Sequence, residues 1–144
     1  MSKLYTAELK SEDVPAYTLA GNATITLLSG NTDKHFTYKI KKAKDKENLY
    51  FIDLLSGSDN EKDYQYIGCY YSDTEYFHAA KPWKDRVTIA WPPSLRAIRF
   101  FLSKLYNIPA NLHVFHEGRC GRCGRRLTTP ESIQRGLGPE CYKR

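Results

Sequence analysis

One histidine and three cysteines near the C-terminal end form the clearest chemical pattern in the chain. His116, Cys120, Cys123 and Cys141 follow the spacing H-x3-C-x2-C-x17-C. A C-x2-C step lets two thiolates bind one metal ion from a tight turn, and tetrahedral zinc takes four nitrogen and sulfur ligands at about 2.0–2.3 Å. The sequence therefore predicts one Zn²⁺ bound by three cysteines and one histidine.

The histidine ligand has a rival in His113. If residues 111–116 form a strand, residues 113 and 116 point to opposite faces. His116 is nearer the C-x2-C step and is the preferred ligand; a water or an outside ligand is the third alternative. No carboxylate accompanies these residues as in H-x-E or H-E-x-x-H motifs, which favours a closed structural zinc site over a catalytic one.

The cysteines could instead form disulfides, as in small secreted proteins. The N-terminus, Met1 to Glu8, has no apolar run typical of a signal peptide. No stretch approaches the ~18 apolar residues of a membrane span. We therefore expect a cytoplasmic protein with reduced cysteines. Cys69 stands apart from the other three, and we expect it to be a small buried side chain.

Positive charge is concentrated in the same C-terminal segment. The net charge of the 144 residues is +6, and residues 117–144 hold seven Lys/Arg against three Asp/Glu. Four arginines surround the C-x2-C step: Arg119, Arg122, Arg125 and Arg126. They could offset the net −1 charge of a Cys3His zinc site and donate hydrogen bonds to its sulfurs. They exceed what one charge requires, so they also indicate a phosphate-binding edge.

A second basic and aromatic region lies earlier in the chain. A lysine run spans a strand end and a turn, with Lys39, Lys41, Lys42, Lys44 and Lys46. Several tyrosines follow, of which Tyr66, Tyr70 and Tyr71 are the candidate binding residues. Tyr70 and Tyr71 are consecutive and must project to opposite sheet faces. Exposed aromatics beside lysines can stack on the bases of single strands or anchor a protein partner. The alternatives are a solvated lysine turn and tyrosines packed with their hydroxyls in water.

The elements that carry these residues read as an α+β fold. Residues 1–13 are expected to be loosely held. From Val14 to Ala90, short strands alternate with turns, at residues 23–28, 35–41, 49–55, 64–71 and 76–79. A helix over about 94–106 has an apolar stripe of Leu95, Ile98, Leu102 and Leu105. We predict an antiparallel meander with one packed helix over residues 1–110 and a zinc-knuckle module over 111–144, in which a short helix begins near Thr129.

The C-terminal segment resembles an uncharacterised family of short zinc-knuckle tails from phage and prophage proteins. The residues that carry the resemblance, over about 113–142, are C-x2-C-G-R-x-L at Cys120–Leu127, P-x-S at Pro130–Ser132 and G-x-G-P-x-C at Gly136–Cys141. The resemblance implies zinc on Cys120, Cys123 and Cys141, an upstream histidine matching His116, and a phage or mobile-element origin. It implies no activity.

Two functions follow as hypotheses. The chain has no P-loop, nucleophile elbow or paired-carboxylate motif, so we do not expect an enzyme. The first hypothesis is a small phage-encoded accessory protein that binds nucleic acid through the arginines, the lysines and the exposed tyrosines. The second is a phage inhibitor that binds a host protein machine, such as a defence nuclease of the CRISPR type or a transcription enzyme.

Overall fold

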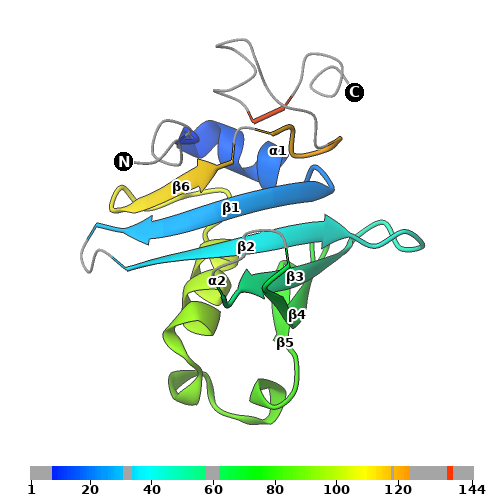
Figure 1. Ribbon diagram of the computed structural model, residues 1–144, viewed down its shortest axis with the longest axis vertical. Coiled ribbons are helices and arrows are strands. Elements are labelled where there is room, and N and C mark those ends of the chain that lie inside the picture. The colour runs from blue at the N-terminus through cyan, green and yellow to red at the C-terminus, as the bar shows by residue number, and fades with distance from the viewer. Residues whose placement is uncertain (1–7, 31–33, 58–61, 118, 124–135, 138–144) are drawn as a thin grey trace.

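A six-stranded antiparallel sheet organises the chain (Figure 1). The structure is a computed structural model that describes residues 8–30, 34–57, 62–117, 119–123 and 136–137. The strand order is β5-β4-β3-β2-β1-β6. The strands are β1 (Asn22–Ser29), β2 (His35–Lys42), β3 (Leu49–Leu55), β4 (Tyr64–Tyr71), β5 (Tyr76–Ala79) and β6 (Leu112–His116). The predicted α+β class and antiparallel meander are confirmed.

Strand β6 does not continue the meander beside β5. β6 pairs with β1 at the far edge of the sheet, where His116 lies opposite Ile25 and Val114 opposite Leu27. The sequence analysis assigned this strand to the C-terminal module, whereas the hydrogen bonding joins it to the sheet of the first 110 residues. β6 therefore delivers the chain directly from the sheet to the C-x2-C step.

The segment before β1 is helical. A short 3-10 turn, η2 (Ser11–Asp13), runs into helix α1 (Val14–Thr18), with Pro15 in its first turn. Proline fits there because the first N–H groups of a helix have no intrahelical partner. The expectation that strands begin at Val14 is therefore wrong for residues 14–18. Val14, Tyr17 and Thr18 are buried, so the amphipathic turn packs on the sheet rather than extending it.

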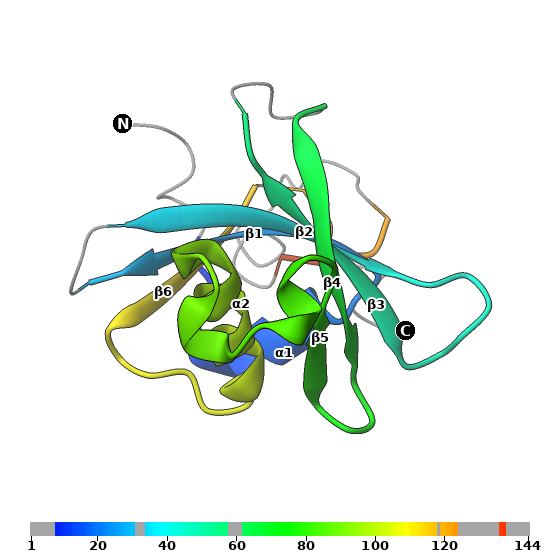
Figure 2. The same ribbon diagram turned by 90° about the horizontal axis from the view of Figure 1, so that it is seen from below.

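Helix α2 (Pro93–Ser103) covers one face of the sheet, which curves around it (Figure 2). The predicted stripe of Leu95, Ile98, Leu102 and Leu105 is buried, with Leu105 just beyond the helix end. The Tyr38 hydroxyl of β2 donates to the Ser94 carbonyl at 2.7 Å, which ties the start of the helix to the sheet. We call this covered side the helix face and the opposite side the outer face. No helix among the described residues is long and apolar enough to cross a membrane.

Strand alternation assigns the lysines and apolar side chains of β2 to different faces. Tyr38 and Ile40 are fully buried on the helix face, and the alternating residues Lys39 and Lys41 start on the outer face. Two small 3-10 turns, η3 (Trp83–Asp85) and η4 (Thr88–Ala90), connect β5 to α2. Trp91 closes this connection, because its indole N–H donates to the carbonyls of Trp83 and Arg86 at 3.0 and 3.1 Å.

Buried tyrosines make the fold sensitive to alkaline pH. Burial raises the pKa of the Tyr17 and Tyr38 hydroxyls well above their ordinary value of 10.0. Below pH 10 both states keep these protons, so the stability is fully present; above it the unfolded chain releases them while the native state holds them. Each such tyrosine then lowers the free energy of unfolding by about 1.4 kcal/mol per pH unit.

We therefore expect the urea midpoint to fall steeply above about pH 10, measured by circular dichroism in a pH series. Tyr106 is largely exposed, so Tyr106→Phe serves as a control and should follow the wild-type curve. A midpoint that stays level across this range would contradict the burial of ionisable hydroxyls.

Candidate metal and nucleic-acid-binding sites

The C-x2-C step forms a turn in which the first cysteine is buried and the second is exposed. Cys120 is 1% exposed and packs with Leu137 and Ala20. The Arg122 backbone N–H donates to Cys120 Sγ at 3.4 Å. A backbone N–H pointing at a cysteine sulfur stabilises its thiolate, the form that binds metal. Cys123 lies close by, with its side chain open to solvent.

Tyr17 anchors this turn to the sheet. A Cβ added at Gly121 would lie 2.6 Å from the Tyr17 ring, and one at Gly136 would lie 2.5 Å from it, so both glycines press against the ring. Gly136 also has a φ of +76°, which L side chains rarely adopt. The Gly121 N–H donates to the Gly136 carbonyl at 2.8 Å, and the Asn22 N–H donates to the Gly121 carbonyl at 2.6 Å. At Gly136 and Leu137 the chain thus returns to the side of the C-x2-C turn, Cys120–Cys123, which we call the knuckle.

The Tyr17 hydroxyl takes the place of a strand partner. β6 ends at His116, opposite Ile25, so the preceding part of β1 lacks β6 as a neighbour. There the hydroxyl donates to the Thr24 carbonyl at 2.9 Å and accepts from the Thr24 N–H at 3.0 Å. The same residue therefore completes the β1 edge and supports the turn that carries Cys120.

The two candidate histidines lie on opposite faces, as the strand argument predicts. His116 is fully buried and faces the Tyr17 ring, with ring centroids 5.4 Å apart. His113 is partly exposed, and its Nδ1 lies 2.7 Å from the Glu8 carboxylate. His113 is thus engaged by an acidic partner from the N-terminal segment, while His116 lies in the part of the core next to the knuckle.

Within the described ranges, no three His, Cys, Asp or Glu side chains form a group that could hold a metal ion. The structure brings Cys120 and Cys123 together but does not group His116 with them. Cys141, Arg125 and Arg126 lie outside the described residues, as does the predicted helix near Thr129. Arg119 and Arg122 both have exposed side chains beside the turn.

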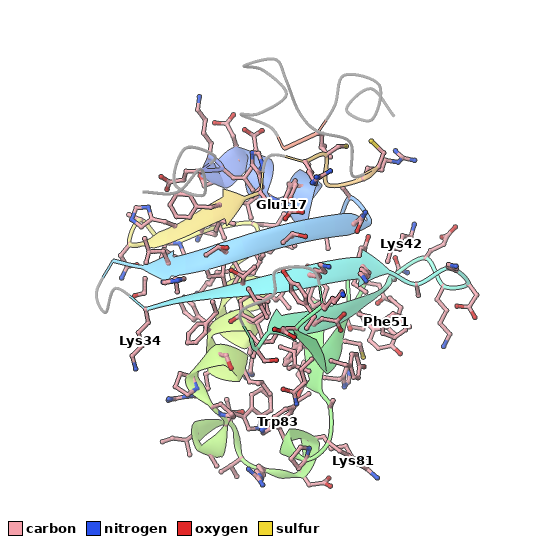
Figure 3. The ribbon with its side chains drawn as sticks, in the orientation of Figure 1. Lys34, Lys42, Phe51, Lys81, Trp83 and Glu117 are labelled. Carbon is pink, nitrogen blue, oxygen red and sulfur yellow. The ribbon has the colours of Figure 1, made fainter. Side chains whose placement is uncertain are left out.

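Lys41 and Lys42 lie at the same end of β1 and β2 as the C-x2-C turn, because Lys41 is opposite Asn22, whose N–H donates to the Gly121 carbonyl. Lys41 is exposed, whereas Lys39 is half-buried and its ammonium lies 4.3 Å from the centroid of the Tyr64 ring. Lys42, one residue on, begins on the opposite face. Figure 3 shows Lys42 and Phe51 near the β2–β3 end and Lys81 at the bottom of the view.

The candidate tyrosines divide between core and surface. Tyr70 is fully buried on the helix face, and its hydroxyl has no hydrogen-bond partner in the part of the chain that the structure describes. The prediction that Tyr70 is a binding residue is therefore wrong, because its buried ring cannot reach a ligand. Tyr66 is 48% exposed and Tyr71 is half-buried, both on the outer face.

An irregularity in β4 gathers further aromatics on the outer face. The β3–β4 register shifts between Ile52 and Asp53, so that Tyr66 lies opposite Asp53 and Cys69 opposite Phe51. This bulge keeps Tyr66, Cys69 and Tyr71 on one face although their numbers do not alternate evenly. Sequence reasoning missed Phe51 and His78 as members of this surface, and it noted Tyr76 in the aromatic cluster without selecting it as a binding residue. Phe51 lies in the nearly continuous apolar run Leu49–Leu55, where no alternation with polar residues indicates which side chains face solvent.

Comparison with known proteins matches only the C-terminal segment. The pattern of a family of unknown function, DUF6011, matches residues 110–144. No curated protein and no solved structure shows a significant match to the chain. The C-terminal segment is thus similar to a family whose function is not established.

Proposed function

We propose that residues 110–144 form a zinc-organised segment and that the protein binds nucleic acid as a small accessory factor of phage or prophage origin. Cys120, Cys123 and Cys141 would hold the ion, with His116 as the fourth ligand. Bound zinc would act structurally by joining the knuckle to the chain that follows Leu137. The arginines beside the knuckle and the lysines of β2 would contact backbone phosphates.

The geometry of the knuckle supports the zinc part of the proposal. The Arg122 N–H bond to Cys120 Sγ is the kind of contact that orients a metal thiolate. Gly136 hydrogen-bonds to Gly121, and Cys141 follows only four residues after Leu137. A stretch of that length spans at most about 13–14 Å, so the third cysteine is tethered within reach of the turn.

Nucleic-acid binding is supported chiefly by the outer face, where exposed aromatic rings lie beside lysines. Lys41 lies directly opposite Phe51 in the β2–β3 register. Phe51 is 41% exposed, an unusual position for a phenylalanine in the middle of a central strand. A basic surface with ring faces available to solvent has the chemistry that recognises phosphates and bases together.

Salt dependence tests this proposal. We expect anisotropy titrations with a labelled single-stranded oligonucleotide to show affinity falling linearly with log salt concentration, because phosphate contacts release counterions. Lys41→Ala should reduce the magnitude of that slope by about 0.7, the value for one contact to a single strand. Lys104→Ala removes another exposed lysine, just after α2 on the covered side of the sheet, and should leave the slope unchanged. A lack of binding even at low salt would refute nucleic-acid binding.

The alternative, a phage inhibitor of a host protein machine, is favoured by one separate observation. Val87 and Ile89, in and beside η4, are 71% and 81% exposed, and Phe100 on α2 is 47% exposed. Exposed apolar side chains of this kind are typical of protein interfaces. Loss of partner capture from host lysate in a Val87→Ser, Ile89→Ser double variant, with oligonucleotide binding absent in the wild type, would favour this function.

A further inference from the structure

We infer that the outer face of β3, β4 and β5 is a base-stacking platform specific for single-stranded nucleic acid. The platform consists of Phe51, Tyr66, Tyr71, Tyr76 and His78. This inference rests on the proposed function and adds to it the strandedness of the ligand and the residues that contact its bases.

The registers align these side chains across neighbouring strands. Lys41, Phe51, Cys69 and His78 lie opposite one another in turn on β2, β3, β4 and β5. Adjacent strands are about 4.8 Å apart, so Phe51 and His78 flank Cys69 at a separation of roughly 10 Å. A cation, an aromatic ring, a small thiol and an imidazole therefore form one row across the sheet.

The rings form two groups that their neighbours hold in place. Phe51 and Tyr66 make an edge contact with ring centroids 6.2 Å apart. The His78 ring makes edge contacts with Tyr71 at 5.5 Å and with Tyr76 at 4.6 Å. An edge contact covers one face of one ring and leaves the other faces of the pair open, so each group can accept a base without first ordering its own side chains.

Charge places the phosphates on one side of the platform. Lys41 is exposed next to Phe51, whereas Lys39 is opposite Asp53 and also covers the Tyr64 ring. The Asp53 carboxylate lowers the positive potential beside Lys39, so phosphate contact is expected mainly at Lys41. Bases that stack on the rings must be unstacked from their neighbours, and a duplex does not offer them. The ligand is therefore a single strand.

The test compares a labelled oligo-dT strand, an oligo-rU strand and a duplex of equal length by anisotropy at low salt. Phe51→Ala and Tyr66→Ala should each weaken binding to the single strands by about tenfold, the order expected for one lost stacking contact. Duplex binding should be weaker in the wild type and unchanged by either variant. Tyr66→Phe keeps the ring and should retain most of the affinity, whereas Tyr66→Leu should not.

Two exposed aromatics outside the platform provide matched controls. Phe100 on α2 is 47% exposed and Tyr106 just after α2 is 64% exposed, close to the values for Phe51 and Tyr66. Both residues belong to or follow the helix that covers the opposite face of the sheet. Phe100→Ala and Tyr106→Ala should leave single-strand binding unchanged.

The outcomes separate this inference from the proposed function. A preference for single strands that the platform variants alone diminish would support the platform. Equal affinity for strand and duplex, or equal losses in platform and control variants, would overturn the platform and leave nucleic-acid binding standing. Absence of binding to all three probes at low salt would overturn both.

Discussion

Replacing Cys120 with serine is expected to abolish zinc binding. The wild-type protein, purified under reducing conditions, should carry one zinc ion per chain by elemental analysis. Structural zinc sites in small modules contribute about 10–16 kcal/mol of apparent binding free energy at neutral pH, and that energy folds the segment. Serine lacks the thiolate, so Cys120→Ser should fall to background zinc and expose the chain after Glu117 to limited proteolysis, while the sheet of β1–β6 remains folded.

The fourth cysteine of the chain provides the control. Cys69 lies half-buried on β4, far along the chain from the knuckle, and burial raises the pKa of its thiol. Cys69→Ser should therefore retain full zinc content, and Cys141→Ser should lose it as Cys120→Ser does. His116→Ala should lower zinc affinity more than His113→Ala. Stoichiometric zinc in Cys120→Ser, or a disulfide between two of the predicted ligand cysteines in the wild type, would refute the metal assignment.

Removing one oxygen atom in Tyr17→Phe should destabilise the protein by about 2–6 kcal/mol. The hydroxyl satisfies both the N–H and the carbonyl of Thr24, and each buried group left unpaired costs about 1–3 kcal/mol. The phenylalanine ring still packs on Gly121 and Gly136, so the loss isolates the hydrogen bonds from the ring contact. Urea unfolding followed by circular dichroism measures the change.

Tyr106→Phe is the matched control for this substitution. Tyr106 is 64% exposed, and a surface hydroxyl of this kind usually contributes within about 0.5 kcal/mol. Tyr17→Leu, which removes ring and hydroxyl together, should cost more than Tyr17→Phe and should also weaken zinc retention. An unfolding free energy in Tyr17→Phe within error of the wild type would show that water replaces the hydroxyl at Thr24.

Much of the sheet could be predicted because its strands carry local signals. β2 alternates buried and exposed side chains, and turn residues flank β1, β3 and β4, so existence and approximate bounds follow from residues near in sequence. The apolar stripe of α2 also repeats at helical spacing. These signals require no knowledge of distant parts of the chain.

The contacts that form the candidate sites were not predictable in the same way. Pairing of β6 with β1, and the packing of Tyr17 on Gly121 and Gly136, join segments far apart in sequence. The assignment of Tyr70 to the core and Phe51 to the surface depends on the β3–β4 register and its bulge. Alternation alone places Tyr70 and Tyr71 on opposite faces and does not indicate which of them is buried.

The position of β6 has a consequence for biosynthesis. Strands β1 to β5 leave the ribosome well before β6, so β1 is a bare edge of the nascent sheet until β6 has been synthesised. Unpaired strand edges can pair with other chains, and β1 contains the mostly apolar and β-branched segment Ala23–Leu28. Translation speed and the time spent bound to chaperones would then govern how much nascent protein escapes aggregation, since β6, which shields β1, emerges after the other five described strands.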